Sequence, residues 1–187
     1  MLRSIRKNKP ELHPLPEPPD FAVPTDDLLK AYTLVAEGSG TNVRSTAEAT
    51  LEQILESEYS GLERCFSRVV GYPSRGVEEI SGSDPLALKE VELSVFPGQL
   101  AVAENGAVWV SEAEVGIRVS PFIAQHLALV VPRHRLVWNM HEAYRQVRID
   151  DTGFGAFIAG PSKTADIEQA LVIGAQGPRS LTVVFTD

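Results

Sequence analysis

A short segment near the C-terminal end combines the residue types that bind an anion. Residues 160–168 read Gly-Pro-Ser-Lys-Thr-Ala-Asp-Ile-Glu and follow the apolar run 156–159. This order predicts a strand, a Gly-Pro turn and a helix over 165–173, whose first N–H groups lack partners and lie at the positive end of the helix dipole. Such a helix start binds a carboxylate or a phosphate, or it is simply a well-capped helix. The candidate anion-binding residues are Gly160, Pro161, Ser162, Lys163, Thr164, Asp166 and Glu168.

Glu104 is a candidate general base or nucleophile because of its position beside a turn. The apolar runs 100–104 and 107–111 flank Asn105-Gly106, and this dipeptide between two alternating runs is a strong hairpin signal. In a two-residue turn Glu104 would pair with Ala107 at the end of an apolar face. A carboxyl group that is partly desolvated there suits proton abstraction or nucleophilic attack. The simpler alternative is an exposed glutamate at a turn.

His126 is the second candidate catalytic residue. It precedes the apolar run 127–131, which is typical of a strand buried on both faces. An imidazole at such a place acts in acid–base chemistry, or it is a structural residue held by a hydrogen bond. The other histidines of the folded part, His134 and His141, lack ligand-like neighbours three or four positions away. We therefore predict no metal site.

The remaining sequence predicts the elements that position these residues. Apolar side chains at helical spacing predict helices at about 25–37, 47–59 and 140–147. Besides the hairpin, strands are predicted at 42–43, 67–71, 92–96, 127–131, 156–159 and 181–185. Strands mixed with helices indicate a three-layer α/β domain, with a mixed β-sheet flanked by helices and one antiparallel β-hairpin.

The N-terminal segment differs from the rest in composition. Residues 10–24 contain six of the thirteen prolines, and residues 1–9 carry four cationic side chains and no acid. A stretch so rich in proline lacks backbone donors and favours extended geometry. We expect a proline-rich arm over 1–24 and a single domain over 25–187.

Bulk composition narrows the class of protein. The chain has 187 residues, 43% hydrophobic and 22% charged, as in ordinary globular domains. A net charge of -8 argues against nucleic acid as a partner, because phosphate contacts drive that binding. The single cysteine, Cys65, forms no intrachain disulfide, cannot alone hold an iron–sulfur cluster and fits a reducing cytoplasm. No apolar run approaches the roughly 20 residues of a membrane span, and we see no signal peptide.

Residues 160–168, continued by 174–179 and the strand at 181–185, resemble the lactate utilization protein C family. That family has a Gly-Pro-Ser-Arg-Thr-Ala-Asp-Ile-Glu signature, then a Gly-x-His-Gly-Pro turn and a terminal strand. Lys163 stands where arginine is usual, which keeps the charge and loses the bidentate fork. Gln176 stands where histidine is common, so that position lacks a group for proton transfer or metal binding.

The resemblance extends over about residues 95–187 and adds residues to the candidate site. The family's Ala-Glu-Thr-Gly-Thr hairpin corresponds to residues 103–107, which contain Glu104 and Asn105. Its run from an arginine through a histidine to Val-Val-Pro is matched loosely by Arg118, His126 and residues 130–132. Asn105 and Arg118 accordingly join the ligand- or anion-binding candidates.

The resemblance implies a fold similar to that of CoA transferases and ribose-5-phosphate isomerase. It also implies an accessory subunit without a cluster of its own, working with two iron–sulfur proteins that oxidise L-lactate to pyruvate. The alternative is a free-standing enzyme similar to CoA transferases or phosphosugar isomerases, with Glu104 as nucleophile or base. In some CoA transferases a glutamate within a Glu-Asn-Gly turn is the nucleophile, which is an argument from the fold.

Overall fold

The computed structural model describes residues 2–11, 13–14, 16–17, 19, 21–77, 85–148, 153–167 and 170–187. The α-helices are α1 (Leu2–Lys7), α2 (Leu28–Gly38), α3 (Leu51–Glu58), α4 (Glu112–Val115), α5 (Ser120–Ile123) and α6 (Met140–Gln146), and the short 3-10 helices are η1 (Pro85–Leu88) and η2 (Arg133–Arg135). The strands are β1 (Thr41–Ser45), β2 (Cys65–Ser67), β3 (Leu93–Pro97), β4 (Leu100–Val102), β5 (Ala107–Ser111), β6 (His126–Pro132), β7 (Leu136–Val137), β8 (Gly155–Ile158), β9 (Lys163–Ile167), β10 (Ala170–Ile173) and β11 (Ser180–Thr186). No helix in this part of the chain is long and apolar enough to cross a membrane.

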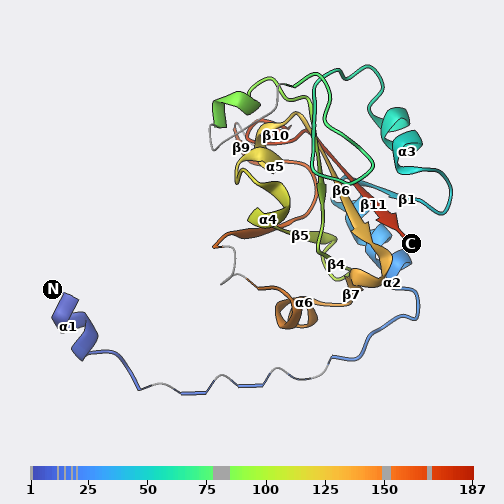
Figure 1. Cartoon of the computed structure of the whole chain (residues 1–187). Coiled ribbons are helices and arrows are strands. Elements are labelled where there is room, and N and C mark those ends of the chain that lie inside the picture. The colour runs from blue at the N-terminus through green and yellow to red at the C-terminus, as the bar shows by residue number, and fades with distance from the viewer. Residues whose placement is uncertain are drawn as a thin grey trace.

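Five strands form a parallel sheet in the order β1-β11-β6-β3-β2 (Figure 1). The central strand β6 is buried from Leu127 to Val131, as its continuous apolar run predicts. Parallel strands require both faces to be covered, and α3 covers one of them. Because all five strands run the same way, the sheet has an amino edge, where the strands begin, and a carboxyl edge, where they end.

The predicted hairpin is confirmed, and it belongs to a second, smaller sheet. β4 and β5 are antiparallel, and β7 and β8 extend this mixed sheet to the order β7-β4-β5-β8. The predicted two-residue turn is wrong, because Val102 pairs with Ala107 and four residues connect the strands. The N–H groups of Ala103 and Glu104 donate instead to the carbonyls of Val137 and Trp138. Contacts with the neighbouring strand thus widen the turn.

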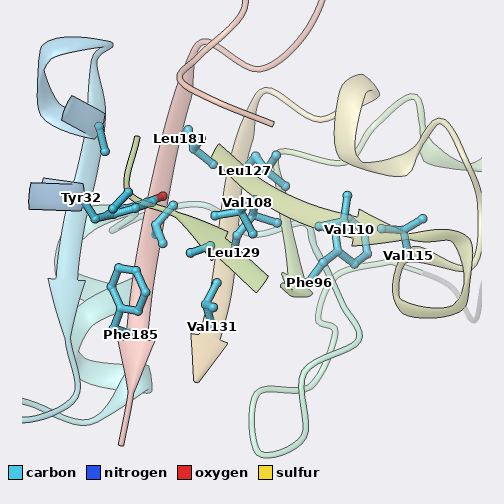
Figure 2. Packing of buried hydrophobic residues seen from close by; sticks show 14 residues of the cluster. Tyr32, Phe96, Val108, Val110, Val115, Leu127, Leu129, Val131, Leu181 and Phe185 are labelled. Atoms are coloured by element: carbon cyan, nitrogen blue, oxygen red, sulfur yellow. The ribbon is translucent and has the colours of Figure 1, made fainter. Parts of the chain in front are cut away.

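The two sheets pack face to face around the main core. Alternate residues of β6 and β11, with Phe96 of β3, face Val108 and Val110 of the hairpin (Figure 2). Tyr32 of α2 closes this core beside Phe185, with an edge-to-face contact between rings 5.0 Å apart. The outer face of the small sheet packs against α6 through residues such as Trp109 and Ala143. The observed order is therefore α3, parallel sheet, small sheet with α2, and α6, within the predicted α/β class.

Gly98 connects the two sheets at the end of β3. A Cβ atom there would lie 2.5 Å from Cγ1 of Val108 and 2.7 Å from Cγ2 of Val131. Its N–H donates to the carbonyl of Val130 at 2.8 Å, so the chain leaves the parallel sheet while still hydrogen-bonded to it. The absence of a side chain lets the hairpin start directly against β6.

Two predicted helices are confirmed, but they begin later than predicted, at Leu28 and at Leu51. Asp27 caps α2 by accepting a hydrogen bond from the N–H of Lys30 at 3.0 Å. Thr50 and Gln53 form a reciprocal capping box at the start of α3. The strand predicted at 67–71 lies earlier, at 65–67, because Val69 and Tyr72 bridge across a turn in which Gly71 has φ +86°.

The N-terminal segment runs outside the sheets, with α1 standing apart from the rest of the chain (Figure 1). Phe21 contacts the domain by stacking on His141, with ring centroids 5.3 Å apart and planes inclined by 16°. The domain boundary near residue 25 stays a prediction.

Candidate functional site

The segment after Gly160-Pro161 forms a β-hairpin, so the predicted helix over 165–173 is wrong. β9 and β10 pair antiparallel, with Lys163 opposite Ile173 and Thr164 opposite Val172. Isoleucine, valine and threonine favour extended backbone, and here that preference outweighs the polar residues that resemble a helix cap. The site therefore lacks the helix dipole on which the predicted anion binding relied.

The candidate residues of this segment occupy different positions. The backbone of Asp166 lies in β9, and Glu168 lies outside the described residues. Gly160 has φ +74°, and a Cβ atom there would lie 2.8 Å from the carbonyl oxygen of Ser39. Only glycine combines this backbone geometry with so close an approach.

Hydrogen bonds between backbones join the two turns that carry the family signature. The N–H of Ser162 donates to the carbonyl of Pro178 at 2.8 Å, and the carbonyl of Ser162 accepts from the N–H of Gly174 at 2.9 Å. Gly177 lies so close that a Cβ atom would be 3.1 Å from Cβ of Ser162. The residues of the signature thus come together chiefly through backbone contacts.

A cavity of about 320 Å³ lies beside these turns, at the amino edge of the parallel sheet. We call it the signature cavity. Its walls come from the segment before β6, the start of β11 and both turns; they include Phe122, Leu127, Pro161, Lys163, Gln176 and Leu181. Its lining combines apolar side chains with a few polar groups, as is usual for sites that hold small organic ligands.

The ammonium group of Lys163, predicted to bind an anion, already has a hydrogen-bond partner outside this cavity. Its exposed ammonium group donates to the carbonyl oxygen of Ser39, which caps the C-terminal end of α2. A cation there is favoured by the negative end of the helix dipole. An anion in the signature cavity would share this ammonium group with the end of α2.

His126 is half-buried at the first residue of β6. Its Nδ1 lies 2.7 Å from the hydroxyl oxygen of Ser180, its partner on β11, and its ring centroid lies 5.4 Å from that of Tyr59. Burial lowers the pKa of His126 below its usual value, and the positive charge of Arg179 lowers it further, while Glu92 opposes the shift. The imidazole is therefore neutral at pH 7 and able to accept a proton.

The structure does not place His126 in the signature cavity. Side chains alternate along a strand, so Leu127 faces the cavity while His126 faces the side of the sheet that α3 covers. Ser180 and Tyr59, which sequence reasoning missed, are the partners of its ring. Tyr59 itself is held by a 2.7 Å hydrogen bond to Thr182. Since these partners are 54 or more positions away, the local sequence gives no signal of the pair.

Glu104 is exposed, so the desolvation predicted for it is absent. Its carboxylate accepts a hydrogen bond from the N–H of Met140 at 3.0 Å, in the first turn of α6. Asn105, also exposed, accepts from the N–H of Ala107 at 3.1 Å within the turn. The hairpin tip is anchored to α2 by the hydroxyl of Tyr32, which donates to the carbonyl of Gly106 at 3.0 Å. These contacts fix the relative positions of the small sheet, α2 and α6.

Arg118 lies apart from the signature cavity. Its guanidinium pairs with the carboxylate of Glu112 at 2.9 Å and lies over the ring of Phe154, with Cζ 5.7 Å from the ring centroid. This side chain is 60% exposed, and the ion pair raises the pKa of Arg118. The structure therefore does not bring Arg118 together with Lys163.

Cys65 and the acidic residues offer no metal centre in the part of the chain that the structure describes. Cys65 is fully buried in β2, and burial raises the pKa of its thiol to about 11. A protonated thiol is a poor metal ligand.

Comparisons with known proteins agree with the signature. Residues 88–186 match the family model described as LUD domain. Lactate utilization protein C of Shouchella clausii is 32% identical over 102 residues, which are 51% of this chain and 44% of that protein. The protein of the same name from Oceanobacillus iheyensis is 25% identical, over 58% of this chain and 49% of the relative. The chain thus spans about half the length of these relatives.

One sequence relative and one solved structure are similar to a larger part of this chain, including residues before the matched LUD domain. Lactate utilization protein C of Exiguobacterium sp. is 24% identical over 86% of this chain and 78% of its own length. The crystal structure of a DUF162 family protein from Deinococcus radiodurans superposes with a TM-score of 0.60 over 86% of this chain and 96% of that one, at 17% identity. This second match shows the same fold.

Proposed function

The chain belongs to the LUD-domain family, and on that premise we propose that it is an accessory subunit for L-lactate oxidation, without an iron–sulfur cluster of its own. Its partners would be two iron–sulfur proteins in the cytoplasm, which carry the electrons taken from L-lactate. The names of the relatives support the assignment to lactate utilization. With one buried cysteine, this chain cannot supply the several thiolates that a cluster requires.

The observation that carries this proposal is the joining of the signature turns at one edge of the sheet. Backbone hydrogen bonds fix their shape. Three exposed apolar side chains lie in α5 and β10, which adjoin these turns in the chain or in the hairpin. Phe122, Leu171 and Ile173 are 37%, 63% and 50% exposed. Phe122 and Ile173 also line one hollow beside Arg179. An apolar patch with a defined shape suits protein association better than catalysis.

The test is purification of the tagged chain under anaerobic conditions from cells growing on L-lactate. We expect an eluate with iron–sulfur absorbance and L-lactate-dependent dye reduction. Ile173→Ser should remove both, whereas Leu34→Ser, a change at a 76% exposed leucine of α2, should keep both. A colourless eluate containing this chain alone would overturn the proposal.

The enzyme alternative gains support from His126 rather than from Glu104. A neutral, half-buried imidazole hydrogen-bonded to Ser180 is equipped to accept a proton. Glu104 stays a predicted nucleophile, but its hydrogen bond to the start of α6 favours a structural role. If the isolated chain turns over a CoA ester or a phosphosugar and His126→Gln abolishes this activity, the enzyme alternative holds.

A further inference from the structure

A second cavity, of about 560 Å³, lies at the carboxyl edge of the parallel sheet. We call it the carboxyl-edge pocket. It is lined by the last residues of β3 and β6, Pro97 and Pro132, and by polar side chains from the segments that follow them. On β6 this pocket is lined by Pro132 and the signature cavity by Leu127, so the two are about 17 Å apart along the strand. Ligands of parallel α/β sheets commonly bind at the carboxyl ends of the strands.

The segment that forms one side of this pocket is strongly basic. Residues 132–148 contain four arginines and two histidines but one acid, Glu142, in a chain whose net charge is -8. Glu142 accepts a hydrogen bond from the N–H of Trp138 at 3.0 Å, so it belongs to the start of α6. His134, Arg135 and Arg148 line the pocket itself.

Arg135 is held in place by one hydrogen bond, and its other hydrogen-bond donors are available. Its Nε donates to the carbonyl of Gln99 at 2.9 Å, and the side chain is half-buried. A guanidinium has five N–H donors, so this one hydrogen bond leaves the N–H groups of both terminal nitrogens available to a ligand. Within the described ranges, no carboxylate forms an ion pair with Arg135 or Arg148.

Glu114 is the acid that lines the same pocket, and its carboxylate is already hydrogen-bonded to other groups. Its Oε1 accepts from the side-chain amide of Gln99 at 2.7 Å. Its Oε2 accepts from the N–H of Ser111 at 3.2 Å and from the hydroxyl of the same residue. These three hydrogen bonds hold the carboxylate against Gln99 and Ser111, and it pairs with neither arginine in the described residues.

We infer that the carboxyl-edge pocket binds a small molecule through a dianionic phosphate group, with Arg135 and Arg148 as its ligands. The planar fork of arginine matches phosphate in geometry, and two such groups match its double charge. The half-buried Arg135 supplies a preorganised contact, and the exposed Arg148, which lines the same pocket, supplies the second. The inference concerns a site separate from the signature cavity and does not depend on the proposed partners.

The test is calorimetric titration of the isolated full chain with inorganic phosphate at low ionic strength, and in parallel with L-lactate as a monoanion. We expect phosphate to bind, and Arg135→Gln and Arg148→Gln each to weaken binding by about tenfold. Arg133→Gln is the matched control, because it removes the same charge from an exposed neighbour that does not line the pocket. That variant should change the affinity by less than about twofold.

Three results would overturn the inference: no heat of binding up to millimolar phosphate, an equal loss in the Arg133 variant, or L-lactate binding as tightly as phosphate. An equal loss of affinity in the Arg133 variant would show that phosphate is attracted by the overall charge of the basic segment and not by a defined site. Circular dichroism of each variant establishes that it is folded, and Arg148 has no hydrogen bond to break within the described residues. Because the titration uses the chain alone, its failure would leave the association with iron–sulfur proteins untouched.

Discussion

The two edges of the parallel sheet are built in opposite ways. At the amino edge, glycines and backbone hydrogen bonds hold the signature turns together, and the lysine of the signature is bound to the end of α2. At the carboxyl edge, charged side chains line a larger cavity, and two arginines have donors left over. The difference indicates that a family signature can specify the shape of a surface, while residues outside any motif supply the charge for a ligand.

The comparison predicts that the amino edge is sensitive to backbone changes. Gly160→Val should lower the free energy of unfolding by about 3 kcal/mol, because the residue has φ +74° and its side chain would meet the carbonyl of Ser39. Urea denaturation measures the effect. Gly38→Ala is the control: it lies in the last turn of α2 with nothing within 4 Å, so it should be neutral or slightly stabilising. Equal effects of the two changes would contradict the account of the signature turns.

Substitutions of Glu104 test whether this residue stabilises the fold or takes part in catalysis. Glu104→Ala should cost about 1 kcal/mol of stability, since the carboxylate caps the N-terminal turn of α6. Glu104→Gln retains an acceptor oxygen and should leave L-lactate-dependent dye reduction of the assembled system unchanged. A folded Glu104→Gln variant without that activity would restore the nucleophile hypothesis.

His126 should give the amino edge a dependence on pH. Its pKa is lower in the folded state than in the unfolded state, so the unfolded chain binds the proton more strongly. The stability contribution of the neutral imidazole is present above the ordinary histidine pKa, about 6.5, and is lost as the pH falls below it. Urea denaturation at pH 7.5 and 5.5 should show a smaller difference for His126→Gln than for the wild type. An unchanged difference would mean that burial of the ring does not favour its neutral form.

Substitution of Arg118 should change stability and ligand binding least. Its ion pair with Glu112 is exposed to solvent, and such pairs contribute about 0.5 kcal/mol or less. Arg118→Gln should therefore leave both stability and phosphate binding nearly unchanged. A marked loss of either, measured by denaturation or calorimetry, would return Arg118 to the candidate anion-binding residues.

The sequence predicted elements well where local signals and tertiary packing agree. The run at 127–131 is the buried central strand, and the helices expected at 25–37 and 47–59 form at Leu28–Gly38 and Leu51–Glu58. The helix predicted at 165–173 is wrong because its polar residues resemble a helix cap, whereas the β-branched residues of the same segment form the hairpin. Site geometry was less predictable still: the partners of His126 and Lys163 lie 54 and 124 positions away. Such contacts depend on the packed fold and leave no local pattern.

The central claim is that this chain completes an L-lactate-oxidising assembly without carrying a cluster itself. The most direct test is L-lactate-dependent dye reduction by the two iron–sulfur proteins, purified anaerobically and assayed with and without this chain. We expect that adding the chain raises the rate and that the three proteins then elute together in gel filtration. A rate that stays the same with the chain present, with the chain eluting alone, would contradict it.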